Sequence, residues 1–311
     1  MKIYYSLEDF TKLNYAVVTS GTFDGVHIGH QKIINKLKEI AAKNNGETVV
    51  ITFWPHPRLI LKPEDESLRL LNTFEEKAEL LKKQGIQHLL RIPFTKEFSQ
   101  ITSQAFIKSI LVDTIGTKKL VIGYDHRFGN NREGSFEQLQ VNGPAYGFDV
   151  QEIERQDIDH VAVSSTKIRK ALESGDIETA NHFLGRAYSL TGEVVKGDKL
   201  GRVLGYPTAN IDIDSRHKLI PSDGIYAVMV THESATYKGM LYIGNRPTIN
   251  GTKRVIEVNL FDFNKEIYGE SLTVYFQDLI RLDEKFHDLE ALKSRLHQDK
   301  IEALSILSKK N

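Results

Sequence analysis

The stretch GTFDGVHIGH, residues 21–30, decides how the first half of the sequence is expected to fold. It follows the β-branched run AVVTSG (16–21) and precedes apolar residues at helical spacing, which indicates a strand, a glycine-bounded turn and a helix. If the helix begins near His27, then His27 and His30 lie on one face of its first turn. Free amides there attract an anion, and Gly29 lets a phosphate approach the backbone closely.

The same rhythm of strand and helix continues along the first half of the chain. Three further short apolar runs predict buried strands: TVVITF (48–53), HLLRI (88–92) and KLVIG (119–123). Thr73 and Glu76 form a capping-box pattern that predicts the start of a helix. A later helix is expected to bury Phe106, Ile107, Ile110 and Leu111. We therefore expect an α/β domain with a mostly parallel sheet, helices on both faces, and ligands beyond the carboxyl ends of the strands.

The second half, from about residue 186, has a different pattern. Strand-like segments separated by turn residues are SLTGEVV, GIYAVMV, YKGMLYIG, RVIEVNLFDF and LTVYFQ. This pattern is typical of an antiparallel barrel or sandwich. A last helix is expected, with an apolar stripe made of Leu289, Leu292, Leu296, Ile301, Leu304 and Leu307. We place the boundary near 183–187 and predict two domains, 1–184 and 185–311.

Composition excludes several classes of protein. The 311 residues contain 41 Lys plus Arg and 41 Asp plus Glu, and a zero net charge argues against a protein organised around nucleic acid or an anionic membrane. A zero net charge does not exclude a local basic pocket for a small phosphate ligand. The absence of cysteine excludes disulfides, thiolate zinc sites and cysteine nucleophiles. Neither a signal peptide nor an apolar run approaching about 20 residues is found, so we expect a cytoplasmic location.

The stretch VSSTKIRKALESG (163–175) is the second candidate phosphate site. It runs from a strand end into a helix, where Ser165 is expected at the N-cap and Gly175 at the C′ position. Ser165 could simply cap this helix, with Lys167 and Arg169 solvated. Alternatively, its hydroxyls, free amides and cations could hold a triphosphate.

Two further stretches follow predicted strands. TFWPHP (52–57) turns at two prolines, and GYDHRFGNNREG (123–134) mixes aromatic, cationic and glycine residues. Either could be an ordinary surface loop, but both fall where parallel sheets bind ligands.

Together these four stretches resemble the HIGH-type nucleotidyltransferases, and in particular the FMN adenylyltransferase domain of bifunctional riboflavin kinase/FAD synthetases. The resemblance implies a Rossmann-like parallel sheet and attack on the α-phosphorus of ATP, with His27 and His30 as electrostatic stabilisers. It assigns ATP contacts to Gly21, Phe23, Asp24, Gly29, Ser165, Thr166 and Arg169. It assigns flavin contacts to Pro57, Asp125, His126, Arg127 and Phe128. His126 stands where the family usually has Phe, and it could still stack on a flavin.

The segment TGEVVKGDKLGRVLGYPTAN (191–210) opens the second candidate site. It is not a Walker A pattern, which excludes a P-loop kinase. Its glycines could form only tight turns, but the interleaved cations, Lys196, Lys199 and Arg202, would suit a phosphate-cradling loop. If the chain is extended here, Thr208 and Asn210 point to the same side and offer hard oxygen ligands for magnesium.

Glu257 lies in the predicted strand RVIEVNLFD. Alternation places Glu257 and Asn259 on one face and Ile256, Val258 and Leu260 on the other. A lone strand glutamate usually faces solvent, whereas one in a cleft could accept a proton from an alcohol.

These segments, with GIY (224–226), IGNRPTI (243–249) and EVNLFDFNKEIYG (257–269), resemble riboflavin kinase. The resemblance implies a small β-barrel with a C-terminal helix, Glu257 as catalytic base, and magnesium on Thr208 and Asn210. It also implies an ATP phosphate loop containing Gly197, Lys199, Gly201 and Arg202. The family usually has Glu-Thr-His, and here Val258 and Asn259 replace the last two residues.

We therefore expect a bifunctional enzyme that phosphorylates riboflavin to FMN and adenylylates FMN to FAD, with ATP as co-substrate and Mg²⁺ as cofactor. Its expected partners are riboflavin, FMN, FAD and ATP, with neither nucleic acid nor membrane. Two alternatives stay open: a nucleotidyltransferase for another small phosphate such as phosphopantetheine, and a flavin or nucleotide sensor. The sequence indicates neither the oligomeric state nor the balance of FMN and FAD, nor whether FMN passes between sites or flavins inhibit.

Overall fold

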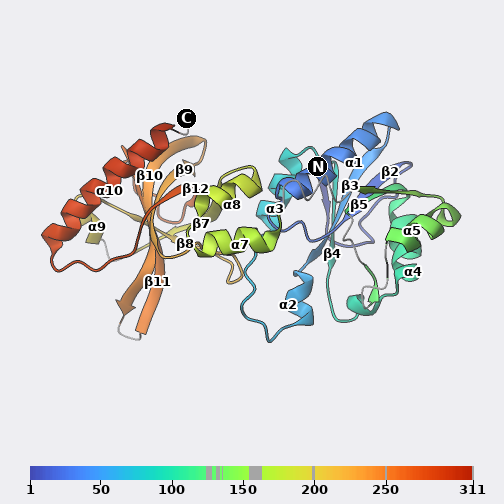
Figure 1. Ribbon diagram of the computed structural model, residues 1–311, viewed down its shortest axis with the longest axis horizontal. Helices are drawn as coiled ribbons and strands as arrows, with labels where there is room; N and C mark the ends of the chain where they lie inside the picture. Colours follow the sequence, from blue (N-terminus) through green and yellow to red (C-terminus); the bar gives the residue numbers. More distant parts are fainter. Residues whose placement is uncertain are drawn as a thin grey trace. The chain divides into compact units, whose positions relative to one another are not determined.

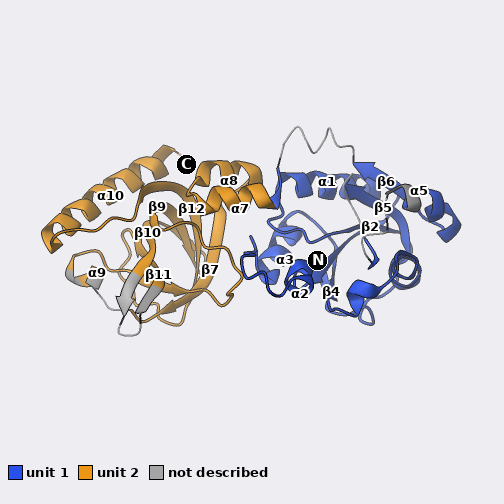
Figure 2. Cartoon of the chain, turned by 60° about the horizontal axis from the view of Figure 1, so that its bottom comes forward, with its two compact units in different colours: residues 1–165 blue, residues 166–311 orange. Residues whose placement is uncertain are grey.

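Figure 1 shows the computed structural model of the chain. The residues that it describes are 1–123, 128–130, 134, 136–153, 163–197, 200–248 and 251–309. They form two compact units, Met1–Ser165 and Thr166–Asn311, which are coloured separately in Figure 2. This division falls earlier than the expected end of the first domain at residue 184, and that boundary stays a prediction.

The first unit is built on a six-stranded sheet in the order β1-β4-β3-β2-β5-β6. Every neighbouring pair in it is parallel, as predicted. The strands are β1 (Lys2–Tyr4), β2 (Ala16–Ser20), β3 (Glu47–Trp54), β4 (His88–Pro93), β5 (Thr117–Gly123) and β6 (Asp149–Ile153).

Helices cover both faces of this sheet. The helical segments are α1 (Ile28–Lys43), α2 (Pro57–Leu61), α3 (Phe74–Lys83), η1 (Phe98–Gln100), α4 (Ser103–Ala105), η2 (Phe106–Ile115), α5 (Phe136–Asn142) and η4 (Gly143–Tyr146). Val17 packs in one core with Ile34 of α1, and its neighbour Val18 packs in a second core with Ile110 of η2. Because successive strand residues point to opposite faces, the two cores lie on opposite sides of the sheet.

The structure confirms two of the expected helices, but one of them has a different helical form. The capping box of α3 is confirmed, because Thr73 Oγ1 accepts from the Glu76 N–H at 3.2 Å and Glu76 Oε2 accepts from the Thr73 N–H at 3.0 Å. The helix predicted around Phe106 and Ile110 is also present and buried, but η2 is π-helical, which its apolar spacing did not indicate.

The second unit contains a closed antiparallel barrel in the order β10-β11-β8-β7-β12-β9, which settles the choice between barrel and sandwich. Its strands are β7 (Tyr188–Val195), β8 (Ala209–Asp212), β9 (Gly224–His232), β10 (Ala235–Thr248), β11 (Gly251–Leu260) and β12 (Ser271–Leu282). The other helices are α7 (Ser165–Glu173), α8 (Ile177–Leu184), α9 (Leu200–Val203) and α10 (Leu289–Lys309). Tyr226 and Phe276 fill the interior edge to face, with ring centroids 5.2 Å apart.

The terminal helix α10 is where predicted, but its apolar stripe is partly wrong. Leu289, Ile301 and Leu304 are 57%, 48% and 38% exposed. The helix instead buries Asp299, whose carboxylate forms ion pairs with Arg281 of β12. The ion pair between Asp299 and Arg281 decides which face of α10 is turned toward β12. The spacing of the leucines alone could not indicate this face.

Candidate active sites

The first candidate site lies at the turn between β2 and α1. Phe23, Gly25 and Val26 all have positive φ angles, of 47°, 87° and 40°. A left-handed backbone is uncommon outside glycine and is strained for a β-branched residue such as Val26. Strain of this kind is found preferentially at functional sites, where the surrounding packing maintains it.

His27 and His30 lie together at the beginning of α1, as the spacing predicted. His27 is the N-cap, and its Nδ1 accepts a hydrogen bond from the His30 N–H at 3.4 Å. The two imidazole rings stack with centroids 3.7 Å apart and planes at 18°. Because Nδ1 is an acceptor, a neutral His27 carries its proton on Nε2, where it can be donated to another group.

Two glycines make room for these rings. A Cβ added to Gly29 would lie 3.2 Å from the His27 imidazole and from Val163, and one added to Gly21 would lie 3.3 Å from the Phe23 ring. The Phe23 ring in turn packs against His30, with centroids 4.9 Å apart. The glycines therefore let the aromatic rings lie directly against the backbone of the turn.

Asp24 connects the turn with two other segments. Its buried carboxylate accepts from the N–H groups of Leu71 and Asn72, at 3.0 and 3.3 Å. Its carbonyl accepts from the Ser165 hydroxyl at 2.8 Å, so the structure brings two of the sequence-predicted stretches together. The carboxylate contacts are structural, and an ATP contact by Asp24 stays a prediction.

The expectation that Ser165 is an N-cap is wrong, because α7 already includes Ser165 and the hydroxyl bonds to the distant Asp24 carbonyl. Gly175 has the expected left-handed conformation, with φ of 79°. The Asp176 and Gly175 N–H groups return to the carbonyls of Ala171 and Leu172, which is the Schellman pattern. Thr166 and Arg169 lie on α7 beyond Ser165, and their phosphate contacts stay predictions.

The predicted flavin-contacting residues are only partly described. Pro57 is the first residue of α2. Asp125, His126 and Arg127 lie outside the described residues. Phe128 is 9% exposed and packs on Phe106 with ring centroids 5.6 Å apart, so its ring belongs to the core. A flavin contact of Phe128 stays a prediction.

Lys77 is a buried cation that the sequence reasoning missed. It is 2% exposed, its Nζ lies 3.4 Å from Thr52 Oγ1, and it lies 5.4 Å from the centroid of the Trp54 ring. Burial lowers the pKa of Lys77 to about 8, and the Asp24 carboxylate partly opposes this shift. The sequence feature that could have indicated this burial is the position of Lys77 on the buried face of α3, between Phe74 and Leu81.

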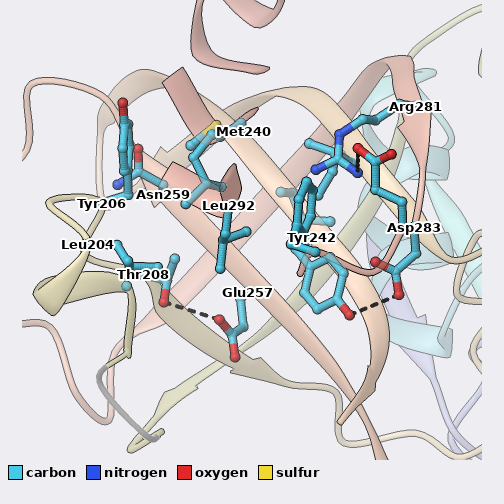
Figure 3. Close-up of a pocket in the computed structure, with 16 residues that line it drawn as sticks. Leu204, Tyr206, Thr208, Met240, Tyr242, Glu257, Asn259, Arg281, Asp283 and Leu292 are labelled. Atoms are coloured by element: carbon cyan, nitrogen blue, oxygen red, sulfur yellow. Dashed lines mark hydrogen bonds and ion pairs between the residues drawn. The ribbon is translucent and has the colours of Figure 1, made fainter. Parts of the chain in front are cut away.

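The second candidate site is a pocket in the barrel unit, shown in Figure 3. Its volume is about 870 Å³ including the open mouth. It is lined by α9 and the segment after it, by strands β9 to β12 and by α10. The lining residues include Thr208, Tyr242, Glu257, Asn259, Arg281 and Leu292. The prediction that Glu257 and Asn259 share a face is confirmed, because both line the pocket.

Glu257 is buried in this pocket, with 5% of its surface exposed. Its Oε2 accepts a hydrogen bond from Thr208 Oγ1 at 3.2 Å (Figure 3), and on the neighbouring strand its Cα partner is Asn210. The interpretation of Glu257 as a solvent-facing strand residue is therefore wrong. The residues predicted as catalytic base and metal ligands lie side by side.

Two glycines shape the segment around these groups. A Cβ on Gly197 would lie 2.1 Å from Asn210 Nδ2, and one on Gly201 would lie 2.3 Å from the Tyr206 carbonyl oxygen and 3.2 Å from Thr208 Oγ1. Only glycine leaves space for such close approach. Arg202 is exposed and lies 3.5 Å from Glu266, while Lys199 is outside the described residues.

The opposite wall of the pocket is charged, which sequence reasoning did not indicate. Tyr242 donates to Asp283 Oδ2 at 3.1 Å, and Arg281 donates two hydrogen bonds to Asp299, each of 2.9 Å. Asp299 is fully buried, so this ion pair fixes the Arg281 side chain beside the pocket. The sequence feature that could have indicated this ion pair is Asp299 itself, an acidic residue at helical spacing between the apolar residues Leu296 and Ala303.

The described residues lack two kinds of feature, a cluster of metal-binding side chains and a membrane-spanning helix. No cluster of three or more His, Cys, Asp or Glu side chains suitable for a metal ion occurs among them. A metal at Thr208 and Asn210 would therefore depend on neutral oxygen ligands and on substrate phosphates. Among the same residues, no helix has the length and apolarity needed to cross a membrane.

Two family models match the chain, one to each half. The model for FAD synthetase matches residues 9–167, and the model for riboflavin kinase matches residues 184–307. The first therefore contains the HIGH turn, and the second contains the barrel pocket.

Relatives that contain both halves match this chain over more than 90% of its length. The bifunctional riboflavin kinase/FMN adenylyltransferase of Listeria monocytogenes is 35% identical over 303 residues, which cover 97% of this chain and 95% of that protein. The enzyme of the same name from Pseudomonas fluorescens is 37% identical over 284 residues, covering 91% and 90%. A Streptococcus pneumoniae crystal structure described as a macrolide-efflux protein is 30% identical, with a TM-score of 0.84 and coverage of 96% and 97%.

Proposed function

The chain belongs to the family of bifunctional riboflavin kinase/FMN adenylyltransferases, and we propose that each of its two candidate sites carries one of the two reactions. The enzyme phosphorylates riboflavin to FMN with ATP and adenylylates FMN to FAD with release of pyrophosphate. The barrel pocket is assigned to the kinase and the HIGH turn to the adenylyltransferase, in domains 185–311 and 1–184.

In the kinase reaction, Glu257 accepts the proton of the riboflavin 5′-hydroxyl. The new bond joins that oxygen to the γ-phosphorus of ATP, the bond from this phosphorus to the β-bridging oxygen breaks, and ADP leaves. The position of Glu257, buried at 5% exposure and lining the pocket, supports this role, because a general base must lie within reach of the hydroxyl that it deprotonates.

Mg²⁺ is part of the same proposal. The hydroxyl of Thr208 and the amide oxygen of Asn210 fit a hard cation that also touches ATP phosphates. Gly197 and Gly201 let these two side chains lie close to the preceding backbone. Bound there, Mg²⁺ would neutralise phosphate charge during transfer. The hydrogen bond from Thr208 to Glu257 keeps the proposed ligand and the proposed base adjacent.

In the adenylyl transfer, a phosphate oxygen of FMN attacks the α-phosphorus of ATP. The bond from this phosphorus to the β-bridging oxygen breaks, and pyrophosphate leaves. FMN phosphate is already anionic, so no general base is needed. Nε2 of His27 and the ring of His30 would stabilise charge on the phosphate oxygens, and the free amides of α1 would add to this stabilisation.

The observation that carries the assignment is the buried Glu257 carboxylate, which lies within hydrogen-bond distance of Thr208 in the pocket of the barrel unit. The test supplies the full chain with riboflavin, ATP and Mg²⁺, and in a second reaction with FMN, ATP and Mg²⁺. Chromatography of the products should show FMN and FAD in the first and FAD in the second. A chain that forms neither product would contradict the proposal, as would kinase activity that survives loss of the Glu257 carboxylate.

A further inference from the structure

The segment Tyr206–Thr208, which approaches the pocket, is fixed by a side chain that the reaction itself does not require. Asn259 is 6% exposed and lies two residues after Glu257 on β11. Its Nδ2 donates to the carbonyl oxygen of Pro207 at 2.6 Å. This acceptor immediately precedes Thr208, whose hydroxyl bonds to Glu257.

A side chain is needed here because the strand ladder stops. β8 and β11 pair at Ala209 with Val258 and at Asn210 with Glu257, and the pairing ends at Ala209. Proline has no N–H, so Pro207 cannot donate to a backbone ladder. The Asn259 amide reaches across and satisfies the Pro207 carbonyl, which continues the attachment of the segment beyond the last backbone pair.

We infer that Asn259 is a positioning residue for the phosphoryl-transfer site: it holds the Pro207–Thr208 segment at the distance from β11 that keeps the Thr208 hydroxyl beside the Glu257 carboxylate. This inference depends on the proposed kinase function of the pocket. Asn259 acts through Thr208, and its contribution is the hydrogen bond that it donates to the Pro207 carbonyl oxygen. The carbonyl is only an acceptor, so the amide must present its NH₂ group.

The other supports of the segment do not replace this bond. The Tyr206 N–H donates to the Gly201 carbonyl at 2.8 Å, which holds the segment on the side of α9. The Tyr206 hydroxyl lies 3.4 Å from His297 Nδ1. In Figure 3, Tyr206 and Asn259 lie at one end of the pocket, and Thr208 points from there toward Glu257. Asn259 is thus the link between the segment and the strand of the proposed base.

The first test variant is Asn259→Asp, which keeps the size of the side chain and removes the donor. The Pro207 carbonyl then loses its partner and faces an acceptor. We expect kcat of the kinase reaction to fall about 10- to 100-fold, because a small displacement of a catalytic group has effects of this order. The Mg²⁺ concentration for half-maximal rate should rise, since Thr208 is a proposed ligand. FAD formation from supplied FMN should be unchanged.

Two further variants separate positioning from folding. Asn259→His restores a donor, because Nδ1–H of histidine lies at about the same reach, and it should recover most of the Mg²⁺ affinity. Asn181→Asp is the matched control: Asn181 Nδ2 donates to the Phe276 carbonyl at 2.8 Å in the same unit, and Asn181 does not line the pocket. It should lower thermal stability and leave the Mg²⁺ dependence of the kinase reaction as in the wild type.

The inference is overturned if Asn259→Asp, folded by circular dichroism and active on FMN, has the Mg²⁺ dependence of the wild type. It is also overturned if Asn181→Asp shifts that dependence equally, or if Asn259→His does not recover it. If Asn259→Asp does not fold, Asn259→Ser provides the same comparison, because the serine hydroxyl is too short to reach. Failure of the proposed function has a different signature, namely a wild-type chain that forms no FMN.

Discussion

The Thr208 hydroxyl donates a hydrogen bond to the Glu257 carboxylate across 3.2 Å, from the segment before β8 to the neighbouring strand β11. This contact places a neutral oxygen ligand and a buried carboxylate at one point of the pocket. A substitution at either residue should therefore disturb phosphoryl transfer to riboflavin and leave the adenylylation of FMN unaffected.

Glu257→Gln should lower kcat of FMN formation by about 10²- to 10⁴-fold, because glutamine fills the same space and cannot accept the proton. The measurement is FMN produced from riboflavin under saturating ATP and Mg²⁺. FAD formation from supplied FMN, by the same preparation, reports folding. Glu193→Gln, on an exposed position of β7, is the matched control and should be fully active. A fall of less than about threefold for Glu257→Gln would exclude the general-base role.

His27→Asn should separate helix capping from transition-state stabilisation. Asparagine is a favoured N-cap, so its Oδ1 can replace Nδ1 as the acceptor for the His30 N–H, while the Nε2 donor is lost. We expect FAD formation from FMN to fall about 10²- to 10³-fold. Loss of the ring stacked on His30 should lower the melting temperature only slightly. Kinase activity in the same chain should persist, and full adenylylation activity in His27→Asn would contradict the role assigned to Nε2.

Gly197→Ala should act on the proposed magnesium ligand Asn210. The new Cβ would lie 2.1 Å from Asn210 Nδ2, so the amide has to move. The Mg²⁺ concentration needed for half-maximal FMN formation should rise about 10-fold, which corresponds to about 1.4 kcal/mol. Gly205→Asn is the matched control, because Gly205 has open space around it and asparagine tolerates its φ of 83°. Equal Mg²⁺ dependence in both variants would count against Asn210.

The buried Lys77 predicts a pH dependence of stability. Its pKa is lowered from the ordinary lysine value of 10.5, which applies to the unfolded chain, to about 8 in the folded chain. Between these two pKa values the unfolded chain binds more protons than the folded chain, so the free energy of unfolding should rise with pH. The destabilisation caused by burying the Lys77 ammonium is therefore complete below about pH 8. Urea unfolding at about pH 7.5 and about pH 9.5 should show a wild-type gain near 2 kcal/mol that Lys77→Met lacks.

The matched control for this measurement is Lys82→Met. Lys82 lies on the same helix with a side chain that is 59% exposed, so its substitution should keep the wild-type pH dependence. An identical pH dependence of Lys77→Met and the wild type would show that burial of the ammonium does not destabilise the folded chain.

Sequence reasoning succeeded where the signals were local. The capping box at Thr73, the strand before the HIGH turn and the C′ glycine at 175 all depend on neighbours within a few residues, and all are confirmed. The choice between barrel and sandwich stayed open because closure depends on pairing between distant strands, such as β9 with β12.

Long-range partners explain the errors. Ser165 has a good N-cap side chain, but its hydroxyl bonds to the carbonyl of Asp24, 141 positions away. Asp299 and Lys77 were passed over because charged residues are usually exposed, and only the folded chain brings Arg281 and Thr52 to them. The roles of the site residues themselves remain predictions, and Asp125, His126 and Arg127 lie outside the described part of the chain.

The closed barrel has a consequence for self-association. Each of its six strands has two neighbours in the ring, although some pairs are short, such as β8 with β11, whereas the parallel sheet ends at β1 and β6. β1 is only three residues long, and β6 reads DVQEI, with Asp149 and Glu152 as charged side chains. Short edges and carboxylates discourage the addition of a foreign strand. We therefore expect the shortness of β1 and the carboxylates of β6 to limit the addition of foreign strands at the two ends of the parallel sheet.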